Sequence, residues 1–193
     1  MGRFLRVYVV DLAKPLEAVG LGDGKLRRMT ETRFAKEFER VDGDPCRDEG
    51  APTMGEAVHA VINGGPFLER YSYCYADAFE KICAFFAEFS DSKGPYHGAW
   101  LAMVDERLGQ LGVDLGLTVF EWMYPAPLSN DEGGYGEWSH SYCVQMCEQW
   151  DALTRDQLAV LDSNTREWAE AAITWAREAA ESPGRGVAGF FSI

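Results

Sequence analysis

Apolar residues gather in two short runs at the two ends of the chain. Residues 3–10 read Arg-Phe-Leu-Arg-Val-Tyr-Val-Val, and residues 186–193 read Gly-Val-Ala-Gly-Phe-Phe-Ser-Ile. Both runs contain the β-branched and aromatic residues that are typical of strands. An apolar strand at a chain end has to pair within the core, because an unpaired edge promotes aggregation. We therefore predict that the two terminal runs lie together in one sheet.

The segment before the last run has the period of a helix. Asn164 is a suitable N-cap with Glu167 three positions later, and Pro183 with Gly184 ends the pattern. The alternation of large rings and small alanines would let this helix lie close to a flat surface, so we predict that it covers the sheet. Its apolar face follows the i, i+3, i+4, i+7 spacing: Trp168, Ala171, Ala172, Trp175 and Ala179.

Helical patterns also cover most of the chain between its ends. Two helix starts carry capping boxes, Thr53 with Glu56 and Thr154 with Gln157. The predicted helices cover residues 12–19, 25–39, 53–62, 71–89, 99–111, 139–150 and a short stretch from 154.

Glycine, proline and acidic residues separate these helices. We predict a mobile loop at residues 42–52, a turn at 93–98 and a loop at 128–138, because such residues favour turns over regular structure. For residues 115–124 the periodicity does not distinguish a helix from a strand.

These patterns predict one domain over residues 1–193. No repeat or linker divides the chain, and a chain of 193 residues can bury a full core. We predict an α/β (α+β) fold of three layers, in which about seven helices surround a small mixed sheet that includes both terminal strands.

The acidic composition excludes one class of function. The formal net charge is −13, whereas a nucleic-acid-binding protein needs concentrated positive charge to contact phosphates. The excess of acids fits two interpretations. It keeps the protein in solution, or it forms a surface complementary to a basic protein partner.

The distribution of apolar residues and cysteines indicates a cytoplasmic protein. The sequence has no run of about 18 apolar residues that could span a membrane, and its N-terminus lacks the pattern of a signal peptide. The five cysteines are an odd number, which fits a reducing compartment better than a disulfide framework.

One group of residues has the spacing of metal ligands. His140, Cys143 and Cys147 lie at i, i+3 and i+7 of one predicted helix, and imidazole with two thiolates suits Zn²⁺. Met146 and Trp150 share that face, so core packing explains the two cysteines equally well. Zinc is the one cofactor that the sequence raises.

A second group suggests a surface for a ligand or a partner. Aromatic and acidic residues on a glycine-rich loop resemble the rim of an interface, although the same aromatics could anchor the loop to the body of the protein. A carboxylate beside a helical core stripe could form a pocket wall or face water. The candidate residues are Tyr73, Asp77, Trp100, Asp131, Glu132, Tyr135 and Trp138.

Several segments together resemble the YfbM-like group of small uncharacterised bacterial proteins, especially its larger actinobacterial relatives. The similar segments span nearly the whole chain in the same order. The resemblance implies a three-layer α/β architecture with helices around a small sheet, and it implies no catalytic residues. The segments are residues 7–12, 57–66, 71–86, 128–139 and 184–191.

The sequence favours a binding protein over an enzyme. It has no Gly-x-Ser-x-Gly motif, so our leading hypothesis is an interaction protein with an acidic surface, of the immunity or inhibitor kind. The alternative is a small metal-dependent or hydrolytic enzyme that uses His140, Cys143 and Cys147. A third hypothesis is a small-ligand sensor with an aromatic pocket near Tyr73 and Trp100.

Overall fold

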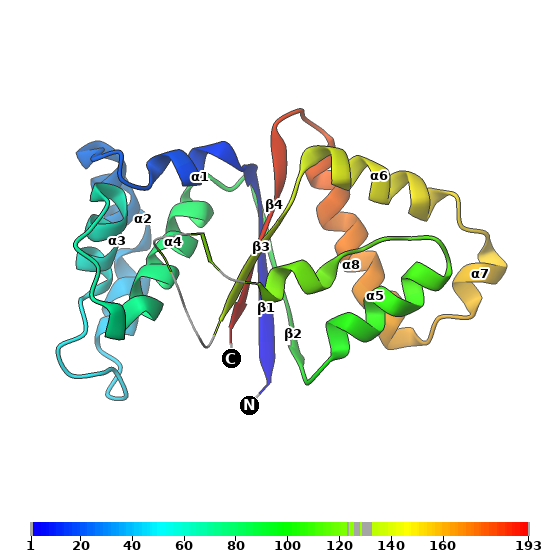
Figure 1. Ribbon diagram of the computed structural model, residues 1–193, viewed down its shortest axis with the longest axis horizontal. Coiled ribbons are helices and arrows are strands. Elements are labelled where there is room, and N and C mark those ends of the chain that lie inside the picture. Colours follow the sequence, from blue (N-terminus) through cyan, green and yellow to red (C-terminus); the bar gives the residue numbers. More distant parts are fainter. Residues whose placement is uncertain (1, 123, 126–127, 129–132, 193) are drawn as a thin grey trace.

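A four-stranded antiparallel sheet forms the middle layer of the protein. Figure 1 shows this sheet edge-on, with helices on both of its faces. The computed structural model describes residues 2–122, 124–125, 128 and 133–192. In the order β2-β1-β4-β3, the strands are β2 (Phe89–Tyr96), β1 (Arg3–Asp11), β4 (Arg185–Ser192) and β3 (Gly134–Trp138).

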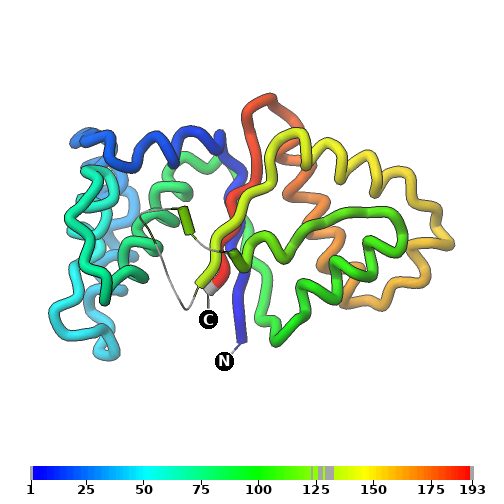
Figure 2. Tube along the Cα trace, in the orientation of Figure 1, coloured from blue at the N-terminus to red at the C-terminus, as the bar shows by residue number. Residues whose placement is uncertain are grey.

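The two terminal strands pair in the centre of the sheet, as predicted. Their register places Tyr8 opposite Ala188 and Arg6 opposite Phe190. Figures 1 and 2 show the two chain ends close together at one edge of the molecule. Every strand pair in the described residues is antiparallel, so the prediction of a mixed sheet was wrong.

Helices cover the two faces of the sheet in the order of the sequence (Figure 1). The described part of the chain holds eight α-helices, and the predicted three-layer α+β fold is confirmed. One face is covered by α1 (Ala13–Ala18), α2 (Gly24–Asp42), α3 (Met54–Asn63), the 3-10 helix η1 (Glu69–Tyr71) and α4 (Ser72–Phe86). The other is covered by α5 (Trp100–Gln110), the 3-10 helix η2 (Leu117–Glu121), α6 (His140–Asp151) and α8 (Ser163–Ala180), with α7 (Arg155–Ala159) at the outer end of this layer.

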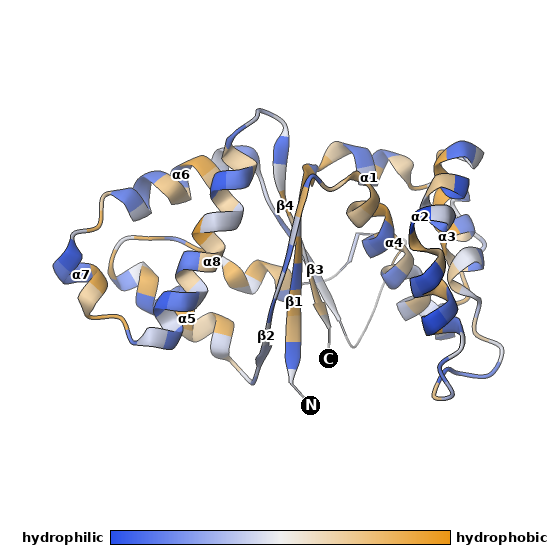
Figure 3. Cartoon of the chain, turned by 180° about the vertical axis from the view of Figure 1, so that it is seen from behind, coloured by the Kyte–Doolittle hydropathy of each residue, from blue (hydrophilic) through white to orange (hydrophobic). Residues whose placement is uncertain are grey.

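Alternation along β1 divides the core into two parts. Leu5, Val7 and Val9 pack with α5, α6 and α8, whereas Tyr8 and Val10 pack with α1 to α4. Successive side chains of a strand point to opposite faces, so a strand between two helical layers is apolar on both sides. Figure 3 shows this apolar stretch of β1 in the middle of the molecule.

The C-terminal helix packs on the sheet through its aromatic face, as predicted. Trp175 is buried, and its indole nitrogen donates a hydrogen bond of 2.8 Å to Asp91 of β2. The ring of Trp168 meets that of Tyr96 edge-on at 5.4 Å. The helix begins earlier than predicted, because the N-cap is Asp162, whose carboxylate accepts a hydrogen bond from the amide of Thr165.

The capping residues in the sequence also predicted the starts of other helices correctly. The side chains of Thr53 and Thr154 both form the predicted capping boxes, and Ser139 caps α6. The loop predicted at residues 42–52 begins one residue later than predicted, because Asp42 is the last residue of α2. The undecided stretch at 115–124 contains η2. None of the helices in the described residues is long and apolar enough to cross a membrane.

Two segments that were predicted to be irregular, a turn and a loop, contain residues of strands. The predicted turn at 93–98 lies partly in β2, and the predicted loop at 128–138 ends in β3. Five of the eight residues of β2 are exposed, among them Ser90, Asp91 and Ser92, which is usual for an edge strand. Its sequence therefore carries no apolar alternation that could have revealed it.

The glycines of β3 and β4 allow η2 to lie directly on the sheet. Gly136 and Gly189 are opposite each other. A Cβ atom on Gly136 would lie 2.2 Å from the carbonyl oxygen of Val119, and one on Gly189 would lie 2.2 Å from the ring of Phe120. Glycine within a strand often marks such a close approach.

We predict that Gly136→Ala lowers the free energy of unfolding by about 3 kcal/mol, because the new methyl group collides with the backbone of η2. Thermal and urea denaturation followed by circular dichroism would measure this change. Gly109→Ala in α5 is the matched control, since a Cβ atom there meets nothing within 4 Å. The control should raise the free energy of unfolding by roughly 0.5–1 kcal/mol, and an equal loss in both variants would contradict the packing argument.

Candidate functional site

The sheet separates the predicted site residues into two groups. Tyr73 and Asp77 lie on α4, with the helical layer α1 to α4, whereas Trp100 packs with the layer α5 to α8. Tyr73 and Trp100 therefore do not line the same aromatic pocket.

Tyr135 and Trp138 belong to the core of the protein. Both are in β3, where alternation sends Tyr135 to one face of the sheet and Trp138 to the other. Trp138 is 1% exposed, and its indole nitrogen donates to the carbonyl oxygen of Gly116 at 3.1 Å. These rings anchor the strand, which was the simpler of the two sequence interpretations. Asp131 and Glu132 lie outside the described residues.

The predicted zinc ligands make separate contacts. His140 Nδ1 lies 3.2 Å from the carbonyl oxygen of Ala179. Cys143 is fully buried, and burial raises the pKa of its thiol to about 12, so the thiolate that zinc requires is disfavoured. Cys147 is half-buried. Across the described residues, no group of three or more His, Cys, Asp or Glu side chains could hold a metal ion, and the zinc site stays a prediction.

A cavity of about 470 Å³ lies next to Tyr73 and Asp77. It is bordered by β1, by the C-terminal half of α2 and by one face of α4. We call it the charged cavity, because seven ionisable carboxylate, guanidinium and ammonium groups line it. They are Arg6, Glu37, Arg40, Asp44, Asp77, Glu80 and Lys81, beside Val41, Met54, Tyr73 and Tyr124.

The positions of these groups follow from the local structure. Arg6 takes the place on β1 where the alternation of Tyr8 and Val10 calls for an inward side chain. Tyr73, Asp77 and Glu80 are spaced four and three residues apart on α4, so they lie along one side of that helix. One charge on a buried strand thus faces a row of polar groups on a buried helix.

Glu80 is the centre of this network. It is 2% exposed, its Oε2 lies 2.8 Å from Arg6 Nη2, and its Oε1 accepts a hydrogen bond of 2.6 Å from the Tyr8 hydroxyl. Burial, and then the charge of Glu80, raise the pKa of Tyr8, so the phenol keeps its proton and remains a donor. A buried charge is strongly disfavoured unless it is paired in this way.

Lys81 extends the network towards α2. It is 7% exposed, and its Nζ lies 2.8 Å from Glu37 Oε1 and 3.8 Å from Glu80 Oε1. The ammonium therefore joins an acid of α2 to the central acid of α4, and the two helices are held by charge as well as by apolar contact.

Asp77 differs from its neighbours because its charge is not paired. In the described part of the chain, no donor makes a hydrogen bond to its carboxylate. Burial, and then the nearby charge of Glu80, raise the pKa of Asp77 to about 6, although Arg6 and Lys81 oppose that rise. A rise from 3.8 to about 6 disfavours the ionised form in the folded protein by on the order of 3 kcal/mol.

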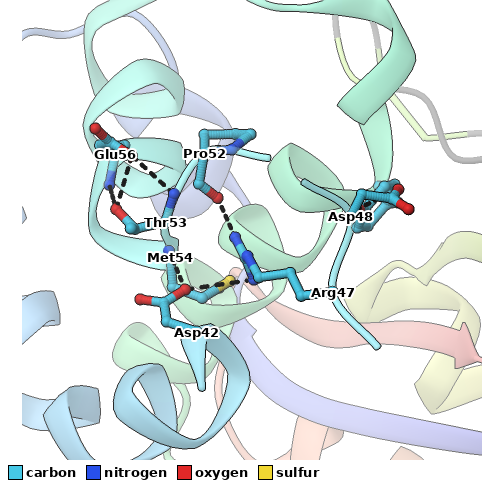
Figure 4. Close-up of polar contacts among 8 residues, drawn as sticks. Asp42, Arg47, Asp48, Pro52, Thr53, Met54 and Glu56 are labelled. Atoms are coloured by element: carbon cyan, nitrogen blue, oxygen red, sulfur yellow. Dashed lines mark hydrogen bonds and ion pairs between the residues drawn. The ribbon is translucent and has the colours of Figure 1, made fainter. Parts of the chain in front are cut away.

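The acidic loop after α2 contributes Asp44 to the lining of the cavity. Figure 4 shows the polar contacts of Arg47 in this loop. Arg47 holds this loop closed: its guanidinium lies 3.3 Å from Asp42 Oδ1 and donates to the carbonyl oxygen of Pro52. The Tyr73 hydroxyl donates to Asp48 Oδ2 at 3.0 Å. The loop that the sequence suggested to be mobile is therefore tied to α2 and α4.

A second cavity, of about 600 Å³, surrounds Trp100 on the opposite side of the sheet. Its Lys93 is paired with Glu167 and lies over the ring of Trp168, with Nζ 5.8 Å from the ring centroid. This larger cavity is lined by a surface ion pair and by two neutral donors that have no partner among the described residues, the Tyr96 hydroxyl and the Trp100 indole nitrogen. The charged cavity instead holds a carboxylate without a charged partner among those residues. We therefore take the charged cavity as the candidate site.

Part of this site was recognisable in the sequence. The sequence raised Tyr73 and Asp77 as possible pocket residues because Asp77 lies beside a helical core stripe, and both line the charged cavity. It did not raise Arg6 or Glu80. An arginine at an inward position of a buried strand, and an adjacent Glu-Lys pair in an apolar helix, are signals that could have indicated them. Their pairing could not be inferred, because the two residues are far apart in the chain.

We predict that Asp77→Asn stabilises the protein by about 1–3 kcal/mol at pH 7.5, because the amide carries no charge to bury. The folded protein keeps the Asp77 proton up to about pH 6, whereas the unfolded chain releases it near pH 3.8. Wild-type stability should therefore fall through this group as the pH rises from about 4 to about 6, and the advantage of the variant should vanish near pH 4. Urea denaturation at several pH values would measure this, and a variant less stable than wild type at pH 7.5 would contradict it.

We predict that the corresponding acid-to-amide substitution at Glu80, one turn further along α4, destabilises the protein. Glu80→Gln leaves the Arg6 guanidinium without its charged partner, so the free energy of unfolding should fall by about 3–5 kcal/mol. The same denaturation series would measure both variants. Equal effects of the two substitutions would show that the network does not distinguish Asp77 from Glu80.

Comparison with known proteins identifies the family. No curated protein and no solved structure gives a significant match to the chain. A family model described as a domain of unknown function (DUF7691) matches residues 1–192. Because that model covers nearly the whole sequence, the chain belongs to the DUF7691 family.

Proposed function

We propose that this chain is a binding protein that takes a small polar ligand into the charged cavity. The observation that carries the proposal is Asp77, an acid with no partner among the described residues, in a cavity whose buried charges are otherwise paired with each other. A group that lowers stability without making an interaction of its own is typical of a functional site.

The size and lining of the cavity support a small ligand. Ligand pockets commonly have volumes of about 300–1,000 Å³, and the charged cavity has about 470 Å³. Its mixture of apolar and charged side chains, such as Met54 beside Asp77, suits a compact molecule with one or two polar groups. The proposal thus assigns the predicted non-enzymatic binding function to the charged cavity.

Three further sequence inferences remain part of this proposal. A basic protein partner for an acidic surface is supported by the net charge of −13, and an immunity or inhibitor role would be its form. The resemblance to the YfbM-like group of bacterial proteins is consistent with the three-layer fold. A cytoplasmic location is supported by the five cysteines, all of which are free thiols.

A catalytic role for the same cavity is the second candidate. A carboxyl group whose pKa is raised to about 6 suits a general acid or base near neutral pH. The hydrolytic alternative based on His140, Cys143 and Cys147 has less support, because those side chains make separate contacts with the core.

We predict that filling the cavity abolishes small-molecule binding. Val41→Trp places a large ring in the cavity wall, whereas Val160→Trp adds the same ring at an exposed position after α7. Thermal shift with pools of small polar metabolites should show stabilisation of the wild type and of Val160→Trp, and none of Val41→Trp. Each shift is measured against the same variant without ligand, so a change in basal stability does not enter.

Native mass spectrometry of the untagged protein, taken gently from its own cell extract, would give an independent measurement. A bound mass of small-molecule size supports the proposal. Thermal stabilisation that persists in Val41→Trp would place the ligand elsewhere, and stabilisation by no pool would contradict small-ligand binding.

A further inference from the structure

We propose that the ligand of the charged cavity is a small organic cation, with a protonated amine or a guanidinium group beside the Asp77 carboxylate. This inference rests on the proposed function and defines the chemical class of its ligand. It follows from which charges of the cavity are paired and from where the unpaired ones lie.

The charges that line the cavity do not cancel. Two ion pairs account for four of them: Arg6 with Glu80, and Lys81 with Glu37, each at 2.8 Å. Three charges remain, which belong to Arg40, Asp44 and Asp77. The remainder is one positive and two negative charges.

The position of these three groups decides what the interior attracts. Arg40 and Asp44 are exposed, so water screens both of them at the rim. Asp77 is half-buried between α4 and the sheet, where a charge interacts more strongly. The uncompensated charge inside the cavity is therefore negative.

A cation is the ligand that this interior would hold most strongly. Its donors could satisfy the Asp77 carboxylate, and charge-assisted hydrogen bonds of this kind are stronger than neutral ones. A neutral ligand would leave the charge of Asp77 uncompensated. An anion would face Asp77, Glu80 and Glu37 at short range, which is unfavourable.

Tyrosine side chains in the cavity wall support the same choice. Tyr73 and Tyr124 both line the cavity, and an aromatic ring attracts a nearby cation through its quadrupole. The ring of Tyr124 is stacked on that of Tyr135 at 5.9 Å, so it is held in place by the core. The wall thus combines fixed rings with one unpaired carboxylate.

Binding should be coupled to the release of a proton from Asp77. Glu80, Arg6, Lys81 and Arg47 act on the charge of this carboxyl. The other titratable groups around the cavity are Tyr73 of α4, Tyr124, Glu37 and Arg40 of α2, and Asp44 of the loop. Burial, together with the first four charges, leaves Asp77 largely protonated below pH 6 in the empty cavity. A bound cation favours the ionised form, so affinity for the cation should fall about tenfold as the pH drops from 7 to 5.

The test compares probes with a four-carbon backbone that differ in their charged or neutral end groups. Isothermal titration calorimetry at pH 7.5 would use 4-aminobutan-1-ol as the cation, butane-1,4-diol as the neutral molecule and succinate as the anion, with agmatine as the guanidinium probe. We expect at least one cationic probe to bind at least about tenfold more tightly than the diol and succinate. At pH 6, titrations in two buffers of different ionisation enthalpy should show net proton release.

Two isosteric variants complete the test: one removes the charge of Asp77, and the other is a control at a distant acid. Asp77→Asn should weaken binding of the cationic probe by about tenfold or more and abolish its pH dependence. Glu148→Gln removes one exposed acid of α6 on the opposite side of the sheet and should leave binding unchanged. Because Asp77→Asn is expected to be the more stable protein, loss of binding in it cannot be attributed to unfolding.

Other results would overturn the inference. Tighter binding of succinate or the diol would exclude a cationic ligand and leave the proposed binding function in place. Binding of Mg²⁺ in preference to both amines would assign the site to a metal ion instead. Binding of no probe, combined with metabolite stabilisation that Val41→Trp abolishes, would also reject the cation while retaining a ligand in the cavity.

Discussion

The pairing of β1 with β4 is the constraint on which the rest of the structure depends. The first and last strands of the chain form the centre of the sheet, so neither helical layer has a complete surface to pack on until both ends are in place. Long-range pairing of this kind carries a high cost in loop-closure entropy. The apolar character of both strands supplies the burial that offsets it.

A charged side chain on a strand that is buried on both faces needs a partner of opposite charge. Arg6 lies on β1 between two helical layers, and the buried Glu80 provides its partner across the interface with α4. The ion pair fixes the position of α4 over the sheet, because shifting the helix would leave both charges unpaired. The same arrangement holds Asp77, one turn away on α4, beside charges that are already satisfied.

The sequence predicted those parts of the fold that local interactions determine. β1, β4, the apolar face of α8 and the caps at Thr53 and Thr154 follow from patterns within about ten residues. β2 and β3 were missed because their neighbours in the sheet define them as strands, and the glycines of β3 are explained only by the approach of η2. In the candidate site, Asp77 was raised because it lies beside a helical core stripe, whereas the pairing of Arg6 with Glu80 depends on the tertiary fold.

Asp77 and Glu80 show why a site has to be identified from pairing and not from composition. Both are acids on one side of the same helix, and 31 acidic residues are spread through the chain. Glu80 is the more deeply buried of the two, yet Arg6 and Tyr8 satisfy it, so its role is structural. Asp77 is nearer to the open cavity and has no such partner among the described residues. Because none of the described residues pairs with this carboxylate, its lack of a partner, and not its acidity, sets Asp77 apart from Glu80.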